Sequence, residues 1–552
     1  MASFVELMKY GRRAERPVDD IPPAHVLVPL ALQHVLAMYA GAVAVPLIVG
    51  GVMVKTGQLQ SGDIVHLIMV DLFVAGIATI IQAVGFWRFG VRLPLMQGVT
   101  FAAVSPMITI GTTHGITAIY GSVIASGIFM MVLSPVYGRL IRFFPPLVTG
   151  TIILIIGVSL MGVSAGWMGN GSSSKDFGEP KYVGMGFLTL LIILLIERFA
   201  PPAIRRISIL LGLVIGTLIS IPFGMPDWSN VKHYGWIGVP HPFQFGTPTF
   251  QISSIISLLI VAIVIMTETT GDIVAVGEIV DEKITPRRLG DGLRADGLGT
   301  VIGGIFNTFP YTAFAQNVGL VAITGVRTRH VATGAGVILV LLGLLPKLAA
   351  VVEGIPQPVL GGAGIALFGM VAASGVRTLS KVRFNNSNIL VVAVSLGVAM
   401  LSEVALSNDG TALDIYGKFP DWFQTIFHSG ISAGAICAIV LNLVFNQRRS
   451  PDDGAPVLPE TSASDAPRGA YIDPREALEA ADPGTSAEKL RELAEKYPDL
   501  HTIIVTNPAA DPELCDWIRA QGDPKVDEIM TRWDDKTNGE FSRRGRAADE
   551  QV

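Results

Sequence analysis

Residues 316–325 read Gln-Asn-Val-Gly-Leu-Val-Ala-Ile-Thr-Gly. Two carboxamides and two glycines thus stand within sequence that is otherwise apolar enough to lie in a membrane. A membrane core has no water to satisfy such groups, so they are kept where the chain lines a cavity. A second polar run, Thr-Glu-Thr-Thr-Gly-Asp at residues 267–272, places two carboxylates in another apolar segment. Together the two segments predict a ligand site inside a membrane protein, as a transporter has.

The composition of the chain is not that of an ordinary soluble protein. Half of its 552 residues are hydrophobic, 15% are charged, and the mean hydropathy is +0.53. Apolar runs of about 17–25 residues, long enough to cross a hydrocarbon layer of about 30 Å, recur along the chain. We predict an all-α integral membrane protein with fourteen transmembrane segments, centred near residues 36, 75, 103, 125, 155, 190, 214, 265, 300, 319, 339, 365, 395 and 434.

The basic residues predict how the protein is oriented. Arginine and lysine gather in alternate loops, such as residues 287–294 and 377–383, and are sparse in the loops between them. Because cytoplasmic loops carry the excess of positive charge, both termini are expected in the cytoplasm. Residues 1–20 carry Lys9, Arg12, Arg13 and Arg16 but contain no apolar core, which predicts a cytoplasmic N-terminal segment rather than a cleaved signal peptide.

Several chemistries are not indicated by the sequence. Cys437 and Cys515 lie in different regions and suggest neither a disulfide nor a metal framework. We find no phosphate-binding loop, metal-ligand cluster or nucleophile–base arrangement. An enzyme, a cofactor, a bound metal and a nucleic-acid partner are therefore not expected.

The chain divides into regions of different composition. After the N-terminal segment, residues 21–446 carry the apolar runs and form the predicted membrane domain. Residues 447–475 are predicted to be a flexible linker, because residues 450–470 are rich in Pro, Ser, Ala and Asp. Residues 476–552 predict a small helical tail in the cytoplasm.

The tail contains a short internal repeat. Residues 482–490 recur in residues 507–515, with Ser486 and Asp511 at matching helix N-cap positions. The tail resembles a pair of variant leucine-rich repeats. An acidic tail with two short amphipathic helices fits the same residues, and both interpretations stay open.

The membrane domain contains two similar interrupted segments. Residues 93–101 and residues 307–317 are each short, broken by Pro or Gly, and contain a glutamine. Each is the third segment of a seven-span half, and two such halves must have opposite orientations in the membrane. Paired broken segments of an inverted repeat indicate a binding site near the midplane. The alternative is that these prolines only kink packed helices.

Glu268 and Asp272 are four residues apart, so they share one face of a helix near the middle of the membrane. An ionised carboxylate at this depth costs at least about 2.5 kcal/mol on insertion scales. Since burial favours the neutral form of a carboxyl group, a proton could bind here and couple to a ligand. We expect Glu268 to contact the substrate and Asp272 to handle the proton. The alternative is that both only hold helices together.

Two further polar residues have a structural and a functional interpretation. Asp296 follows a basic loop and fits either a functional carboxylate or a cap or surface ion pair. His34, beside Gln33 in the first span, fits hydrogen bonding between helices at least as well as ligand contact. Both residues are kept as candidates.

The candidate ligand contacts are planar or aromatic groups. Gln316 offers a donor and an acceptor in one plane, which suits a flat ligand with amide-like edges. Asn317 could act in the same way or hold a broken backbone in shape. Phe101, next to Thr100, could stack on a flat ring.

Four segments, in this order along the chain, resemble the signature motifs of the nucleobase–ascorbate transporters, or nucleobase:cation symporters. They are Gln33 to Tyr39, Gln97 to Phe101, Glu268 to Asp272, and Gln316 to Gly325. The resemblance covers about residues 20–446 and leaves the tail outside it.

The resemblance implies a fold. It is a 7+7 inverted repeat with a core domain, about residues 21–140 and 250–350, and a gate domain, about residues 141–249 and 351–446. Spans three and ten would contain short antiparallel strands beside which a nucleobase binds. The resemblance also implies a proton symporter and a homodimer, in the inner (plasma) membrane of a bacterium.

The resemblance implies a role for each candidate residue. Glu268 would hydrogen-bond the edge of the base, and Gln316 would make the second polar contact. The remaining residues would complete the pocket through the backbone (Thr100, Phe101), support coupling and site geometry (Asp272, Asp296, Asn317) and tune affinity (His34).

The substrate branch follows from the same motifs. Glu-x-x-Gly-Asp at 268–272 resembles the xanthine and uric acid permeases, and Thr100 is similar to the residue of urate-preferring members. Val318 departs from the pattern, since many xanthine and urate carriers have asparagine there. We therefore expect proton-coupled import of uric acid, xanthine or both. A uracil or other nucleobase carrier, a related anion exchanger and a non-transporting sensor that uses the tail stay open.

Overall fold

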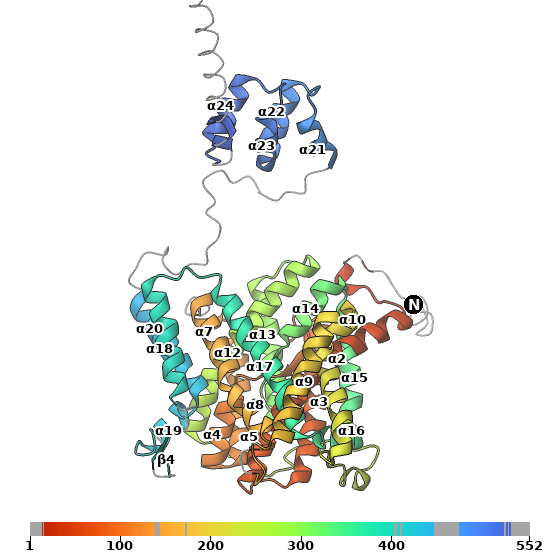
Figure 1. Cartoon of the computed structure of the whole chain (residues 1–552), viewed down its shortest axis with the longest axis vertical. Helices are drawn as coiled ribbons and strands as arrows, with labels where there is room; N and C mark the ends of the chain where they lie inside the picture. Colours follow the sequence, from red (N-terminus) through yellow and green to blue (C-terminus); the bar gives the residue numbers. More distant parts are fainter. Residues whose placement is uncertain are drawn as a thin grey trace, which may run out of the picture. The chain divides into compact units, whose positions relative to one another are not determined.

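The computed structural model describes residues 14, 16–137, 144–171, 174–401, 406–408, 411–413, 415–446, 474–523, 526–527 and 529–531. The chain divides into two units, Met1–Pro456 and Val457–Val552, and the described residues of each are compact (Figure 1). Most of the predicted N-terminal segment and of the predicted linker lie outside the described residues.

The membrane unit is built almost entirely of helices. In the first half of the chain its elements are η1 (Pro17–Asp19), α2 (Ala24–Lys55), α3 (Ser61–Val84), β1 (Gln97–Val99), α4 (Val104–His114), α5 (Ile116–Leu133), α7 (Pro146–Ser159), α8 (Met161–Met168), α9 (Pro180–Phe199), α10 (Pro202–Arg205), α11 (Ser208–Ser220), η3 (Ile221–Phe223) and η4 (Val231–His233). In the second half they are α12 (Ile252–Val280), α13 (Pro286–Ile305), β2 (Tyr311–Ala313), α14 (Ala315–Thr324), α15 (Arg329–Gly343), α16 (Pro346–Glu353), α17 (Gln357–Leu379), α18 (Asn386–Met400), β3 (Leu406–Asn408), β4 (Thr411–Leu413), α19 (Asp421–Phe427) and α20 (Gly430–Asn446).

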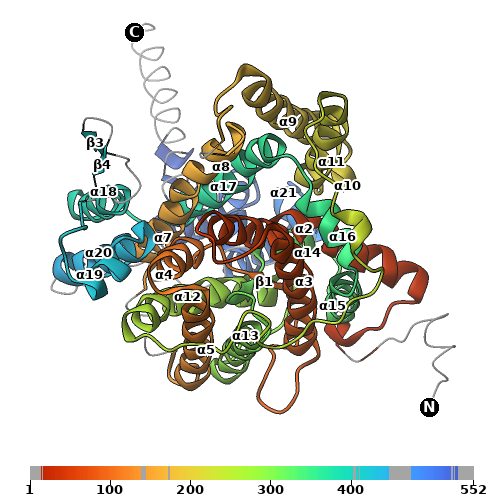
Figure 2. The same cartoon turned by 90° about the horizontal axis from the view of Figure 1, so that it is seen from below.

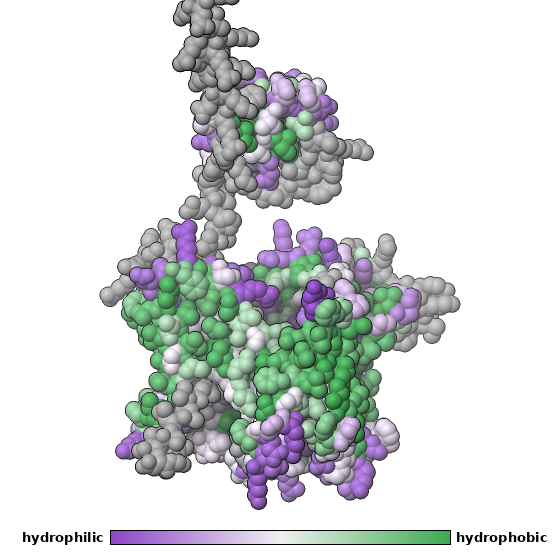
Figure 3. Space-filling view, viewed as in Figure 1, coloured by the Kyte–Doolittle hydropathy of each residue, from purple (hydrophilic) through white to green (hydrophobic). Residues whose placement is uncertain are grey.

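Many of these helices fit a membrane. Seven described helices are long and apolar enough to cross one, or up to nine if α15 with α16 and α19 with α20 are each one bent span. On the face shown in Figure 3, apolar side chains form a broad band across the membrane unit, between more hydrophilic ends. The chain is therefore a multi-pass helical membrane protein. Fourteen spans, the number expected from the sequence, stays a prediction.

The helices pack as two groups (Figure 2). The first helix group contains α2, α3, α5, α12, α13 and α15, in which α15 packs on α3 and α13 packs on α5. The second helix group contains α7, α8, α9, α11, α17, α18 and α20, in which α17 packs on α7, α8 and α9. Each group combines helices from both halves of the chain.

Close glycine contacts hold the first helix group together. A Cβ added to Gly76 of α3 would lie 2.5 Å from the carbonyl oxygen of Gly336 on α15, and one added to Gly336 would lie 2.8 Å from that of Gly76. Gly127 on α5 and Gly297 on α13 make the same reciprocal contact, at 2.6 and 2.7 Å. Such small residues let helix backbones approach closely in a membrane.

Two short antiparallel sheets interrupt the helices. β1 pairs with β2, with Gln97 opposite Ala313 and Val99 opposite Tyr311. β3 pairs with β4 in a local hairpin. The β1–β2 pair joins distant parts of the chain, one strand from each interrupted segment that the sequence singles out.

The part of the N-terminal segment that is described packs against the membrane unit. Asp19 forms ion pairs with Arg16 at 2.5 Å and with Arg329 at 2.7 Å, at the start of α15. Val18, which directly precedes Asp19, is buried in an apolar cluster that includes Val276 of α12 and Val321 of α14. These contacts fix the chain just before the first long helix.

The second unit is a small helical array with its own apolar core. Ser486 Oγ accepts a hydrogen bond from the amide of Lys489 at 3.3 Å, and Asp511 Oδ1 accepts one from the amide of Leu514 at 2.6 Å. The two N-caps predicted from the repeat are thus confirmed. Its described helices are α21 (Pro474–Ala481), α22 (Ala487–Lys496), η6 (Pro498–Leu500), α23 (His501–Ile504) and α24 (Pro512–Ala520).

The glycine contacts predict the effect of a bulky side chain. Gly297→Leu should destabilise the protein by about 1–3 kcal/mol because the side chain must displace the backbone of α5. Gly184→Leu on α9 is the matched control, since a Cβ at Gly184 would meet no heavy atom within 4 Å. The measurement is the thermal melting of both variants in detergent. Equal melting temperatures would show that the α5–α13 contact does not limit stability.

Candidate functional site

The centre of the candidate site is the antiparallel pair of β1 and β2, where the two interrupted segments meet. This pair is called the strand crossing below. The pairing continues beyond the strands, because the amide of Thr100 donates to the carbonyl of Pro310 and the amide of Phe314 to that of Met96, each at 3.0 Å. Both strands are buried. Each interrupted segment therefore satisfies the backbone polar groups of the other in a place without water.

Two threonines brace the strands from neighbouring helices. The amide of Gln97 donates to Thr79 Oγ1 on α3 at 2.9 Å. In the other half, the amide of Tyr311 donates to Thr300 Oγ1 on α13 at 3.1 Å. Both threonines are fully buried. The two halves of the chain thus use the same contact to hold the first residue of each strand.

Glu268 and Asp272 lie on one face of α12, as predicted, and both are partly buried. Neither side chain has a hydrogen-bond or ion-pair partner among the described residues. A Cβ added to Gly271, between them, would meet no heavy atom within 4 Å, and the same is true of Gly319 on α14. Open space therefore borders this part of α12 and of α14.

Asp296 belongs to the interior and not to the protein surface. It is fully buried, and its oxygens accept hydrogen bonds from Gln82 Nε2 at 2.9 Å and Thr269 Oγ1 at 2.5 Å. Thr269 Oγ1 also accepts a bond from the amide of Ala313 at 3.2 Å. Asp296 thus connects α3, α12 and α13 next to β2, and the alternative of a surface ion pair is wrong.

Asn317 joins α14 to α2. Its Nδ2 donates to the carbonyl of His34 at 2.9 Å and lies 3.1 Å from His34 Nδ1, with both residues buried. Asn317 Oδ1 is buried without a partner in the described part of the chain. His34 therefore makes the contact between helices that the sequence left as one alternative.

Thr100 and Phe101 lie at the end of β1. Thr100 is buried, and its Oγ1 accepts a hydrogen bond from the amide of Ala102 at 3.1 Å. The ring of Phe101 meets that of Phe368 on α17 edge to face, with the centroids 5.6 Å apart. Phe101 thus connects the end of β1 to α17 of the second helix group.

Gln316 borders a cavity of about 410 Å³ between α14, α2 and the α9–α11 region. Phe314 and Gly319 line the same cavity, but Glu268, Asp272, Thr100 and Phe101 do not. Its charged lining residues are Glu197, Arg205 and Arg206. Of the candidate residues, Gln316 alone lines this cavity.

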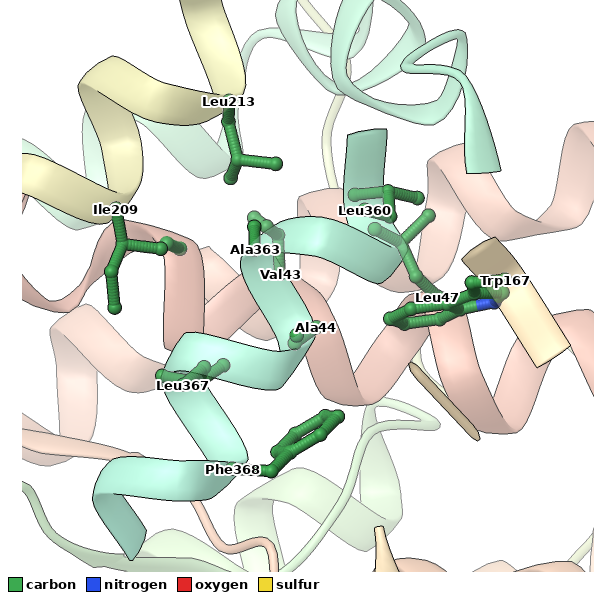
Figure 4. A pocket seen from close by; sticks show the side chains of 12 residues that line it. Val43, Ala44, Leu47, Trp167, Ile209, Leu213, Leu360, Ala363, Leu367 and Phe368 are labelled. Carbon is green, nitrogen blue, oxygen red and sulfur yellow. The ribbon is translucent and has the colours of Figure 1, made fainter. Parts of the chain in front are cut away.

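A narrow apolar space of about 20 Å³ lies between α2 and the second helix group (Figure 4). It shares Ala40, Ile209 and Leu367 with the cavity beside Gln316. Trp167 and Phe368 project into it from α8 and α17 (Figure 4). The contact between the helix groups is thus tight in this region and open beside Gln316.

Asp71 is a site-region residue that the sequence analysis missed. It is fully buried on α3, and its Oδ1 accepts hydrogen bonds from Tyr311 Oη at 2.7 Å and Thr308 Oγ1 at 3.1 Å. Tyr311 belongs to β2, so Asp71 holds that strand through its side chain. An aspartate near the middle of an apolar helix of 24 residues was the available signal.

Fold and site together define a class of protein. Two interrupted segments meet inside a bundle of apolar helices, beside buried carboxylates and an open cavity. Secondary transporters bind their substrates in arrangements of this kind. Residues 25–406 match the model of a family described as the Permease family, so the chain belongs to that family, the nucleobase–ascorbate transporters. It is a transporter and not an enzyme.

Individual relatives cover most of the membrane unit. The uric acid transporter UacT of Escherichia coli (strain K12) is 44% identical over 441 residues, which are 78% of this chain and 89% of that protein. The xanthine permease of Bacillus subtilis (strain 168) is 44% identical over 418 residues, which are 76% of this chain and 93% of that protein.

Two further comparisons concern other features of the chain. Residues 474–532 match the model of the Leucine Rich Repeat Variant domain, on the segment where the sequence showed a repeat. Among solved structures, the transmembrane domain of a cyanobacterium bicarbonate transporter, BicA, is similar at a TM-score of 0.48 and 17% identity, covering 68% of this chain and 96% of that one.

The Asp71–Tyr311 hydrogen bond predicts a stability difference between two tyrosine variants. Tyr311→Phe should cost about 1–3 kcal/mol because a buried carboxylate oxygen loses a donor. Tyr120→Phe is the control, since Tyr120 is equally buried and its hydroxyl has no partner in the described chain. The measurement is thermal melting in detergent, with Asp71→Asn to complete a double-mutant cycle. Additive effects of Tyr311→Phe and Asp71→Asn would contradict the contact.

Proposed function

We propose that this protein imports a purine, uric acid or xanthine or both, together with protons. The observation that carries the proposal is the convergence of all four motif segments on the strand crossing. Asn317 donates a hydrogen bond to the carbonyl of His34. Thr269, next to Glu268 in the chain, accepts one from the amide of Ala313 in β2, and β1 pairs with β2. The uric acid transporter and the xanthine permease at 44% identity support the substrate class.

We propose fourteen spans in two inverted halves of seven, with both termini in the cytoplasm. The helices already counted, with each bent pair as one span, supply nine. The shorter apolar segments Ser208–Phe223 and Asn386–Met400 add two, and α13 and the two strand–helix segments supply the rest. The repeated threonine contacts at Thr79 and Thr300 support an inverted repeat.

The first helix group, with the strand crossing, would be the core domain, and the second helix group would be the gate domain. Alternating access would then be a movement of the core against the gate. The tight apolar contact around Trp167 and the open cavity beside Gln316 support this proposal. They fit a site that is closed on one side and accessible on the other.

In this proposal the purine binds beside the strand crossing. Glu268 would accept hydrogen bonds from the N–H groups on one edge of the base, and the amide of Gln316 would pair with a second edge. Backbone groups near Thr100 and Phe101 would complete the pocket. The free carboxylate of Glu268 in the described chain and the open space at Gly271 and Gly319 support these contacts.

Proton coupling would use Glu268 and Asp272. Two like charges four residues apart on a helix repel each other, so uptake of one proton relieves the repulsion. Substrate binding and proton binding would then favour each other. Asp296, Asn317 and His34 would hold the strands and helices in position, as their hydrogen bonds already do.

Other features of the proposal concern the assembly and the tail. We propose a homodimer in the inner (plasma) membrane, surrounded by lipid, with a cytoplasmic tail from about residue 476. The match of residues 474–532 supports variant leucine-rich repeats in that tail. Thr100 favours uric acid, whereas Val318 departs from the pattern of both substrates.

The proposal predicts the effect of neutralising Glu268. Glu268→Gln should lower gradient-driven uptake at least about tenfold, because a hydrogen bond to a charged group is lost together with a proton acceptor. Radiolabelled uric acid and xanthine are supplied to proteoliposomes with and without an inward proton gradient. Glu278→Gln is the matched control, since Glu278 is exposed on the same helix and should leave uptake unchanged.

Two results would change the proposal. Normal, pH-dependent uptake by Glu268→Gln would remove Glu268 from the mechanism. Failure of the unmodified protein to transport either purine would direct the same assay to uracil and other nucleobases, and failure with all of them would favour a sensor.

A further inference from the structure

The cavity beside Gln316 carries an excess of positive charge. Arg205 and Arg206 come from the α10–α11 connection, and Glu197 from the end of α9. Gln316, on α14, lines the same cavity. A ligand in this cavity therefore meets one amide and the guanidinium groups across a single space.

Of the charged groups that line the cavity, Arg206 is the one whose side chain makes no hydrogen bond in the described chain. Glu197 already accepts a hydrogen bond from Ser208 Oγ at 3.1 Å, and Arg205 Nη2 lies 3.4 Å from the carbonyl of Ala200. The guanidinium of Arg206 is partly buried and has neither an ion pair nor a hydrogen bond within the described ranges. An unpaired cation in a partly buried position is available to an anion from the cavity.

We propose that Arg206 binds the anionic form of the purine in this cavity, next to Gln316, and so favours an acidic purine over a neutral one. This inference rests on the proposed function. Uric acid is largely a monoanion at neutral pH, whereas xanthine is largely neutral. The planar guanidinium suits a flat anion with delocalised charge.

The apolar walls of the cavity strengthen the attraction between Arg206 and an anion. They include the apolar side chains of Ile209, Leu367 and Met370. Low-dielectric walls focus the field of a charge into the space between them, which raises the local concentration of an oppositely charged ligand. The field of Arg206 thus acts in the same space that borders Gln316.

The experiment compares binding of two purines to the purified full-length protein. Equilibrium binding of radiolabelled uric acid and xanthine is measured in detergent at about 20 and about 200 mM salt, since salt screens charges at these concentrations. The variants are Arg206→Gln and Arg206→Lys. Arg198→Gln is the matched control, because Arg198 directly follows Glu197 in the chain but does not line the cavity.

We expect Arg206→Gln to weaken uric acid binding about tenfold at low salt and to remove its salt dependence. Xanthine binding should change less than about twofold, and Arg206→Lys should retain much of the affinity for uric acid. Unchanged uric acid binding in Arg206→Gln would overturn the inference. Equal loss of both purines would also overturn it, because Arg206 would then act on the fold of the site.

Binding to the unmodified protein separates failure of the inference from failure of the proposed function. If the unmodified protein binds neither purine, the proposed function fails and this inference fails with it. If it binds xanthine alone, only the preference for an anion is overturned.

A lipid phosphate is a second source of the same anionic chemistry. Repeating the assay with added phosphatidylglycerol tests this source. If the lipid abolishes the difference between the unmodified protein and the Arg206→Gln variant, the arginine is assigned to lipid and the inference is overturned.

Discussion

The structure depends on how two interrupted segments satisfy their backbone polar groups inside an apolar bundle. An unpaired amide or carbonyl costs several kcal/mol where no water is present. The pairing of β1 with β2, extended by the bonds of Thr100 and Phe314, removes most of this cost. Since each strand needs the other, neither interrupted segment can hold its shape alone. The two halves of the chain are thereby tied together at the place where the candidate ligand groups lie.

The crossing in turn needs helices at fixed distances on both sides. Thr79 and Thr300 reach the first amide of each strand because α3 and α13 lie directly beside the crossing. The close glycine contacts of α3 with α15 and of α5 with α13 keep those two helices in position. Small residues that are not candidate ligand contacts thus contribute to the geometry of the site.

The sequence predicted the features that rest on local pattern. The apolar runs, the two interrupted segments and the N-caps at Ser486 and Asp511 follow from residue order alone. It could not decide the environment of Asp296, because burial there depends on Gln82 and Thr269 from other helices. Asp71 was missed for the same reason, since its partner Tyr311 lies 240 positions away. The number of spans stayed open because bent helix pairs and strand–helix segments lack a continuous apolar run.

The carboxylates near the crossing fall into two kinds, and the difference bears on mechanism. Asp71 and Asp296 are fully buried and accept hydrogen bonds from Tyr311 of β2 and from Thr269 of α12, respectively. A change in the charge of either would disturb the strands, so they suit a fixed role. Glu268 and Asp272 are only partly buried and have no such partners in the described chain. Because a buried charge is costly until it is paired, these two have the most to gain from a ligand or a proton. The protein thus separates the carboxylates that hold the site from those that can respond to what enters it.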